Sequence, residues 1–288
     1  MSGTQKEPPS TVEEADASVP LTSTEEEQVR KRTSLRAAVV FETVRREGES
    51  ELNRPVLSLA FSGLAAGLSM GFSLVVTGLL RANLPDAPWR VLVENFGYTI
   101  GFLIVVLGRQ QLFTENTVTA ILPLLQNPNK SETLMKVARL WAAVLAANLL
   151  GAVIFAYVVA HSSIFPPNVQ SAFLQLAQKT IEPAFWTIVV RGIFAGWLLA
   201  LMVWLLPAAD TQKLWVVLII TYVVGAAGLS HIIAGSVEAL YGVAAGAISW
   251  STYFGGFLLP VFIGNAIGGV MLVSLLNYGQ VAPENPEN

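Results

Sequence analysis

The 288-residue chain is 53% hydrophobic and only 13% charged, with a net charge of −3. Soluble domains carry about 25% charged residues. This composition and the mean hydropathy of +0.57 therefore indicate an integral membrane protein. The chain lacks the basic excess of a nucleic-acid-binding protein. It contains no cysteine, which excludes disulfides, thiolate metal sites and cysteine nucleophiles.

Two polar segments precede the apolar part of the chain. Residues 1–33 are rich in Ser, Thr, Pro and Glu, and we expect a disordered cytoplasmic tail because so few apolar side chains are available for burial. No apolar run follows Met1, so no cleavable secretory signal is expected. Residues 34–54 place Leu35, Val39 and Val44 at helical spacing among charged residues. This pattern predicts an amphipathic cytoplasmic helix lying on the membrane surface or packed on the protein itself.

Residues 55–277 contain six apolar stretches, each long enough to cross a bilayer. They cover about 56–80, 94–126, 137–160, 184–206, 217–246 and 253–276. Glycines recur at four-residue spacing within them, as at Gly63, Gly67 and Gly71, which lets neighbouring helices approach closely. The sequence therefore predicts an all-α, multi-pass bundle, followed by a short cytoplasmic tail at 278–288.

The positive charges near the spans predict the orientation of the chain. Seven of them fall on the side of the termini, and three fall on the opposite side. The first group is Arg45, Arg46, Arg54, Lys130, Lys136, Arg139 and Lys213, and the second is Arg81, Arg90 and Lys179. Because cytoplasmic segments carry the excess of Lys and Arg, both termini are predicted to be cytoplasmic.

The second and fifth apolar stretches are each interrupted. Polar residues 109–111 divide the second, and a small-residue run from Gly225 to His231 divides the fifth. Lipid does not hydrogen-bond an open backbone, so such breaks must be buried in protein or line a water-filled path. Two breaks at corresponding places are typical of transporters built from inverted repeats.

His231 is the first candidate for a functional residue. An ionisable side chain within an apolar span is a functional candidate by default, and histidine exchanges protons near neutral pH. The alternative is a neutral histidine that is hydrogen-bonded between helices. A helix restarting at His231 would present its free N–H groups to the break, and such an end attracts anions.

The first break offers the matching half of a site. Thr114 supplies a hydroxyl group, whereas Leu112 and Phe113 are apolar and are expected to crowd the path. Such a path would pass small solutes and resist ions. For Glu115 and Asn116 the favoured interpretation is helix capping without a ligand contact.

Two arginines lie within or at the edge of apolar stretches. Arg109 and Arg191 each need a partner there, and Glu115 and Glu238 are the candidates. One interpretation is a fixed positive charge that attracts an anion. The other is a structural ion pair, or an arginine reaching to the membrane interface.

Three motifs resemble the formate/nitrite transporter family. They are Leu112-Phe113-Thr114 after the first break, Gly228-Leu229-Ser230-His231-Ile232-Ile233-Ala234 at the second, and Gly264-Asn265-Ala266-Ile267-Gly268-Gly269 in the sixth stretch. The run from Arg109 to Thr119, with Glu94-Asn95 and Gly97-Tyr98-Thr99 before it, resembles the YfdC-type branch of that family more closely. The resemblance covers about residues 51–276.

The resemblance implies an aquaporin-like six-helix fold of inverted three-helix repeats with broken second and fifth helices. It also implies a homopentamer in which each subunit has its own path for small monovalent anions such as formate or nitrite. A central histidine would lie between two apolar constrictions. By position, the histidine is His231 and the adjacent hydroxyl is that of Thr114.

The constrictions also carry over by position. One falls at Tyr98 and Phe102, facing Val224, and Leu199 falls on the other apolar wall. Several polar positions of the family are changed: a pore asparagine falls at Gly196, and the remaining changes fall at Arg109, Gln111, Ser230 and Gly235. The scaffold is thus retained while much of the polar lining differs, so the resemblance does not fix formate as the substrate.

Together with this resemblance, the sequence predicts a pentameric channel or transporter of the bacterial inner membrane for small monovalent anions or their conjugate acids. The first alternative is a channel for neutral solutes, although the paired Asn-Pro-Ala boxes of aquaporins are absent. The second is a non-transporting membrane protein that acts through its N-terminal segment. An enzyme is not expected, because no metal-ligand cluster, nucleophile–base pair or phosphate loop is evident and His161 falls in a connection. No cofactor is implied.

Overall fold

The computed structural model describes residues 21–25 and 35–281. The chain divides into two units, Met1–Leu35 and Arg36–Asn288. In the first unit, residues 23–25 form one helical turn, in which the Thr22 N–H donates to the Glu25 carboxylate at 2.8 Å. The expectation of disorder for the rest of 1–33 lies outside the described residues, as do residues 282–288 of the expected tail.

The second unit begins with α2 (Ala37–Leu52), which lies within the stretch predicted to be amphipathic. Its buried side carries Phe41 and Val44, and the Phe41 ring meets the Trp204 ring edge-on at 6.3 Å. On its other side, Glu42 accepts hydrogen bonds from Arg45 and Arg46, which lower the pKa of Glu42 to about 2. One face of α2 thus packs on the rest of the unit, and its relation to a membrane surface stays a prediction.

Five helical segments of the described chain are long and apolar enough to cross a membrane. Four are α3 (Val56–Asn83), α4 (Arg90–Leu107), α7 (Lys130–His161) and α9 (Phe185–Leu205). The fifth, Thr252–Met271, is composite: it contains π-helical η3 (Thr252–Leu258), α12 (Leu259–Ile267) and the start of π-helical η4 (Gly268–Leu275). At 1.5 Å per residue, α3 extends about 42 Å, against about 30 Å of hydrocarbon.

Shorter helices form the two interrupted stretches. In the first, α4 is followed by α5 (Phe113–Thr119) and α6 (Ile121–Gln126). In the second, α10 (Lys213–Ala226) is followed by α11 (Ile232–Ala244). These two helices have 14 and 13 residues, so neither alone reaches the roughly 20 residues of a crossing. The helical conformation is lost at the two places where the sequence predicted a break.

One helix was not expected from the sequence. The connection after α7 contains α8 (Pro167–Ile181), whose apolar residues Val169, Phe173 and Leu176 are buried. Phe173 packs edge-on against Tyr241 of α11, with ring centroids 5.3 Å apart. The remaining described elements are the short 3-10 turns η1 (Leu206–Ala208) and η2 (Asp210–Gln212) and the terminal α13 (Leu276–Val281).

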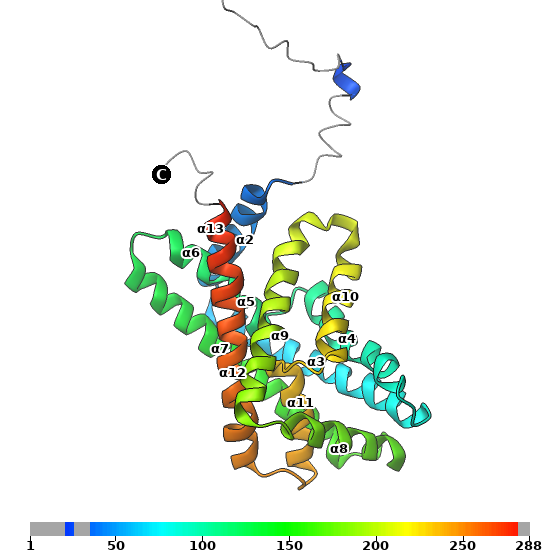
Figure 1. The fold of residues 1–288 in the computed structure, drawn as a ribbon. Coiled ribbons are helices and arrows are strands. Elements are labelled where there is room, and N and C mark those ends of the chain that lie inside the picture. The colour runs from blue at the N-terminus through cyan, green and yellow to red at the C-terminus, as the bar shows by residue number, and fades with distance from the viewer. Residues whose placement is uncertain (1–20, 26–34, 282–288) are drawn as a thin grey trace, which may run out of the picture. The chain divides into compact units, whose positions relative to one another are not determined.

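Two helix pairs owe their close contact to glycine. An added Cβ at Gly67 of α3 would lie 2.1 Å from the backbone oxygen of Asn148 in α7. An added Cβ at Gly196 of α9 would lie 2.5 Å from the backbone oxygen of Asn265 in α12. Figure 1 shows α9 and α12, which pack together. These crossings place the two broken segments around a common buried cluster.

Candidate functional site

The first break begins with a specific ending of α4. The N–H of Arg109 donates to the Val106 carbonyl at 3.1 Å, and the N–H of Gln110 donates to the Val105 carbonyl at 2.9 Å. This pair of hydrogen bonds is the Schellman motif, which requires a left-handed residue after the helix. Arg109 supplies that residue with a φ of 52°. A position that favours glycine is therefore occupied by arginine.

The second break is built in the same way. The N–H of Gly228 donates to the Gly225 carbonyl and that of Leu229 to the Val224 carbonyl, both at 3.0 Å. Gly228 has a φ of 61°, as expected for glycine at this position. The spacing is also the same. Arg109 lies three residues before Leu112, the N-cap residue of α5, and Gly228 lies three residues before His231, the N-cap residue of α11.

A buried asparagine holds the first break in place. The Oδ1 of Asn148, in α7, accepts the Phe113 N–H at 3.0 Å. Its Nδ2 donates to the carbonyls of Gly63 at 2.7 Å and Gln111 at 2.9 Å. Asn148 thus satisfies backbone groups on both sides of the opened chain, which lipid could not do.

Asn265 holds the second break with the same set of hydrogen bonds. Its Oδ1 accepts the Ile232 N–H at 2.9 Å, and its Nδ2 donates to the carbonyls of Gly192 at 2.9 Å and Ser230 at 2.8 Å. Sequence reasoning missed the roles of both asparagines. The available signal was a single amide side chain in an otherwise apolar span.

The two breaks meet at His231 and Thr114. The Nε2 of His231 lies 2.9 Å from the Thr114 hydroxyl oxygen, and His231 is 1% exposed. Its Nδ1 accepts the Ala234 N–H at 3.1 Å and so caps α11. Because Nδ1 must offer a lone pair to that N–H, the neutral ring carries its proton on Nε2 and donates it to Thr114.

Aromatic side chains lie on the α4 side of the histidine. The Phe102 ring meets the His231 ring edge-on at 4.9 Å, and the Tyr98 ring lies 5.3 Å from that of Phe102. Both residues are buried, and Val224 belongs to the same buried cluster. These are the three residues that the resemblance assigned to one constriction.

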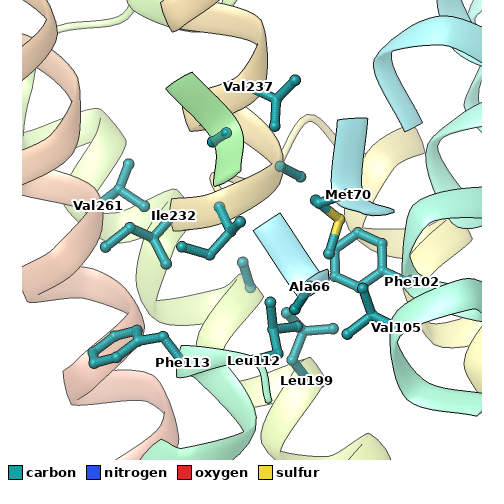
Figure 2. Packing of buried hydrophobic residues seen from close by; sticks show 14 of the residues in the cluster. Ala66, Met70, Phe102, Val105, Leu112, Phe113, Leu199, Ile232, Val237 and Val261 are labelled. Carbon is teal, nitrogen blue, oxygen red and sulfur yellow. The ribbon is translucent and has the colours of Figure 1, made fainter. Parts of the chain in front are cut away.

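The apolar side chains at the first break occupy different parts of the buried cluster. In the view of Figure 2, Leu112 and Leu199 project into the same part of the buried cluster, whereas Phe113 lies apart. The Phe113 ring stacks on Phe262 at 5.6 Å and meets Trp141 edge-on at 5.5 Å. Leu112 is extended and Phe113 is the first helical residue, so the two side chains leave the chain in different directions. The expectation that both side chains crowd one path stays a prediction.

Two of the expected charge contacts are different in the structure. Arg109 is paired with Glu47 of α2 at 2.9 Å, not with Glu115, because its side chain points outward and is 81% exposed. Glu115 and Asn116 both lie inside α5, where Leu112 is the N-cap residue, so neither of them caps the helix. Among the described residues, the buried Oε1 of Glu115 has no hydrogen-bond partner.

Arg191 and Glu238 line one cavity without pairing. This cavity has a volume of about 90 Å³ and reaches His231 from the side of α8. Glu238 accepts a hydrogen bond from the Thr180 hydroxyl. Within the described part of the chain, Arg191 forms no salt bridge, so the expected Arg191–Glu238 ion pair is absent there. Gly196, the position of the family's pore asparagine, faces the α12 backbone and is not among the cavity-lining residues.

Fold and site together define a helical membrane protein whose two broken segments meet at a buried histidine. The chain belongs to the formate/nitrite transporter family, because the family model described as "Formate/nitrite transporter" matches residues 38–279. This is a family of transporters and channels.

Relatives and solved structures agree with this assignment. The chain is 40% identical over 246 residues to "Inner membrane protein YfdC" of Escherichia coli K12, covering 85% of this chain and 79% of the relative. It is 29% identical to the "Probable formate transporter" of Methanothermobacter thermautotrophicus, covering 76% and 82% of the two chains.

Two solved structures share the fold. A "Pentameric formate channel with formate bound" matches with a TM-score of 0.67 at 19% identity, covering 79% of this chain and 98% of that one. An "FNT family ion channel" matches with a TM-score of 0.71 at 22% identity, covering 85% and 98%.

Proposed function

We propose that the chain forms a homopentameric inner-membrane channel or transporter for small monovalent anions, such as formate or nitrite, or for their conjugate acids. Each subunit would contain its own path. The observation that carries this proposal is the contact between His231 and Thr114, where two broken helices meet next to buried apolar side chains. The solved fold relatives, one titled as a pentameric formate channel, support the assembly.

The construction of the two breaks supports an inverted three-helix repeat. Each break has a Schellman ending, a left-handed residue and an asparagine that binds three backbone groups. Corresponding positions are Arg109 and Gly228, and Asn148 and Asn265. A duplicated unit explains why two stretches far apart in the sequence form the same hydrogen bonds.

The hydrogen bonds of His231 indicate in which protonation state a solute passes the apolar constriction. A bare anion pays a large desolvation cost at an apolar wall, so it needs either a positive partner or a proton. A second ring proton would sit on Nδ1 and face the Ala234 N–H that Nδ1 now accepts. The geometry therefore favours a neutral imidazole that donates through Nε2, with the solute crossing the constriction as its neutral acid.

The proposed inner-membrane location and orientation are supported by the distribution of positive charges and by a similar protein. The excess of Lys and Arg on the side of the termini supports cytoplasmic termini. The relative at 40% identity bears the name of an inner membrane protein. Multi-pass insertion agrees with the five spanning segments of the described chain.

Solute uptake by proteoliposomes tests this function. Purified protein is reconstituted, and influx of formate, nitrite and glycerol is followed by stopped-flow light scattering. We expect formate or nitrite to enter well above protein-free vesicles and glycerol to remain at the background rate. Glycerol influx without anion influx would favour the neutral-solute channel. No influx of any solute, with a physiological defect only after deletion of residues 1–53, would favour action through the N-terminal segment.

A further inference from the structure

A serine of α3 forms hydrogen bonds with the backbone of α4 beside the rings that adjoin His231. The Ser73 hydroxyl donates to the Tyr98 carbonyl at 2.7 Å and accepts the Gly101 N–H at 3.0 Å. Ser73 is 4% exposed, so these contacts are shielded from water. A serine within an apolar helix commonly bonds a carbonyl of its own helix, one turn earlier. Ser73 instead joins two helices, which its own burial does not require.

Glycines bring the two helices close enough for this bridge. An added Cβ at Gly101 would lie 2.5 Å from the Ser73 hydroxyl oxygen, and one at Gly97 would lie 2.4 Å from the α3 backbone. Both glycines therefore face α3. Each is followed by an aromatic residue, Tyr98 or Phe102, whose side chain points about 100° further around the helix. The contact with α3 thus fixes how α4 is turned about its axis, and with it the direction of both rings.

The direction of these rings decides how tight the wall beside His231 is. The Phe102 ring meets the His231 ring at 4.9 Å, and the Tyr98 ring lies 5.3 Å from that of Phe102. Figure 2 shows Phe102 within the buried apolar cluster. A bare anion pays a large desolvation cost at such a wall, whereas an opening that admits water lets the ion keep part of its hydration. A small rotation of α4 would therefore weaken the barrier to anions more than it changes the passage of a neutral acid.

We propose that Ser73 is a positioning residue for this constriction. Its hydroxyl holds the α4 turn in the orientation in which Tyr98 and Phe102 exclude hydrated anions and leave a route for the neutral acid. Ser73 is not among the described residues that line the cavity beside His231, so it acts through α4 and not on the solute. The proposal rests on the proposed transport function and assigns part of its ion barrier to a residue outside the solute path.

A membrane potential distinguishes the two forms of the solute, because it drives an anion and not a neutral acid. Formate uptake into proteoliposomes is measured at pH 7.5 with and without a valinomycin-clamped potassium potential, positive inside. We expect wild-type uptake to be indifferent to the potential and Ser73→Ala uptake to rise by roughly twofold or more. Ser73→Cys keeps the shape but weakens both hydrogen bonds, so it should respond in the same direction and less strongly. A serine with a purely structural role would change the melting temperature and not this ratio.

Two further variants make the test specific. Ser69→Ala changes a serine one turn earlier in α3, whose hydroxyl has no hydrogen bond within the described part of the chain, and it should behave like the wild type. Phe102→Ala opens the wall directly, so its uptake should follow the potential. Adding Ser73→Ala to Phe102→Ala should then have no further effect, because both changes act on the same wall.

Several results would overturn the proposal. They are uptake by Ser73→Ala that ignores the potential, wild-type uptake that already follows it, and a Ser73→Ala effect that persists in full in Phe102→Ala. If no formate enters with the wild type, the transport function fails, and NMR with labelled histidine then tests the positioning alone. His231 adjoins the Phe102 ring, whereas His161 stacks on Tyr157. Ser73→Ala should shift the ring signals of His231 and not those of His161, and unchanged signals from both would reject the positioning role.

Discussion

Arg109 and Gly228 occupy the same position in the two breaks, yet they differ in conformational preference. Both have positive φ, at 52° and 61°. A left-handed conformation costs a non-glycine residue roughly 1–2 kcal/mol. The arginine gains an ion pair with Glu47 in exchange, but that pair is exposed, and such pairs contribute little.

Replacing Arg109 therefore has an effect that depends on the new residue. Arg109→Ala loses the ion pair and keeps the strain, whereas Arg109→Gly loses the pair and removes the strain. We expect the glycine variant to be more stable than the alanine variant by about 1 kcal/mol, measured by thermal unfolding in detergent. Gly228→Ala should lower the melting temperature. An alanine variant at 109 as stable as the glycine variant would show that Arg109 is unstrained.

Replacing either of the two asparagines should have a larger effect on stability than replacing Arg109. Asn148→Ala and Asn265→Ala each leave three backbone groups unpaired beside a break. We expect each to lower the free energy of unfolding by about 2–4 kcal/mol. Asn83→Ala is the control, since within the described part of the chain its exposed amide donates only to the Leu79 carbonyl. Melting temperatures that match this control would contradict the proposed role of the asparagines.

Sequence reasoning located the site partners but not the residues that hold them. His231 and Thr114 were recognisable because ionisable and hydroxyl side chains next to a broken span are conspicuous. The roles of Asn148 and Asn265 depend on which backbone groups face them across a helix crossing, which spacing along one chain does not reveal. The partner of Arg109 was missed for the same reason, because Glu47 lies 62 residues away on α2.

At the level of elements, the breaks and five of the six apolar spans were predictable, whereas α8 was not expected. A polar insert or a small-residue run marks a break directly in the sequence. The apolar residues of α8 do repeat at helical spacing, but its polar face made the segment resemble a connection. The direction of the Phe113 side chain could not be predicted from the sequence, because at a helix start it depends on the local backbone.

The close packing of α9 on α12 can be tested at Gly196. Gly196→Val would place a branched side chain where even a Cβ lies 2.5 Å from the Asn265 oxygen. Since Asn265 holds the second break, we expect a loss of at least 1–3 kcal/mol in stability together with slower solute uptake. Gly279→Val is the control, because an added Cβ there meets no atom within 4 Å. A Gly196→Val protein that melts and transports like this control would disprove the close packing.

At the level of the whole molecule, several large apolar side chains are exposed in the single subunit. Among them are Leu57, Phe61, Met135 and Trp186, each at least 67% exposed. Lipid or neighbouring subunits must cover such surfaces. Native mass spectrometry from detergent should therefore give a species with five copies of the 30.9 kDa chain. A monomer that retains solute uptake would reject the pentamer and leave the path within each subunit intact.

The proposed transport function depends most directly on a solute path that passes His231. The decisive measurement is formate and nitrite uptake into proteoliposomes at pH 5.5 and 7.5, with wild type, His231→Ala and His161→Ala compared. His161 is exposed at the end of α7 and serves as the matched control. We predict faster uptake at pH 5.5, where more of each solute is the neutral acid, with uptake lost in His231→Ala and unchanged in His161→Ala. Full uptake by a folded His231→Ala protein at both pH values would contradict the account.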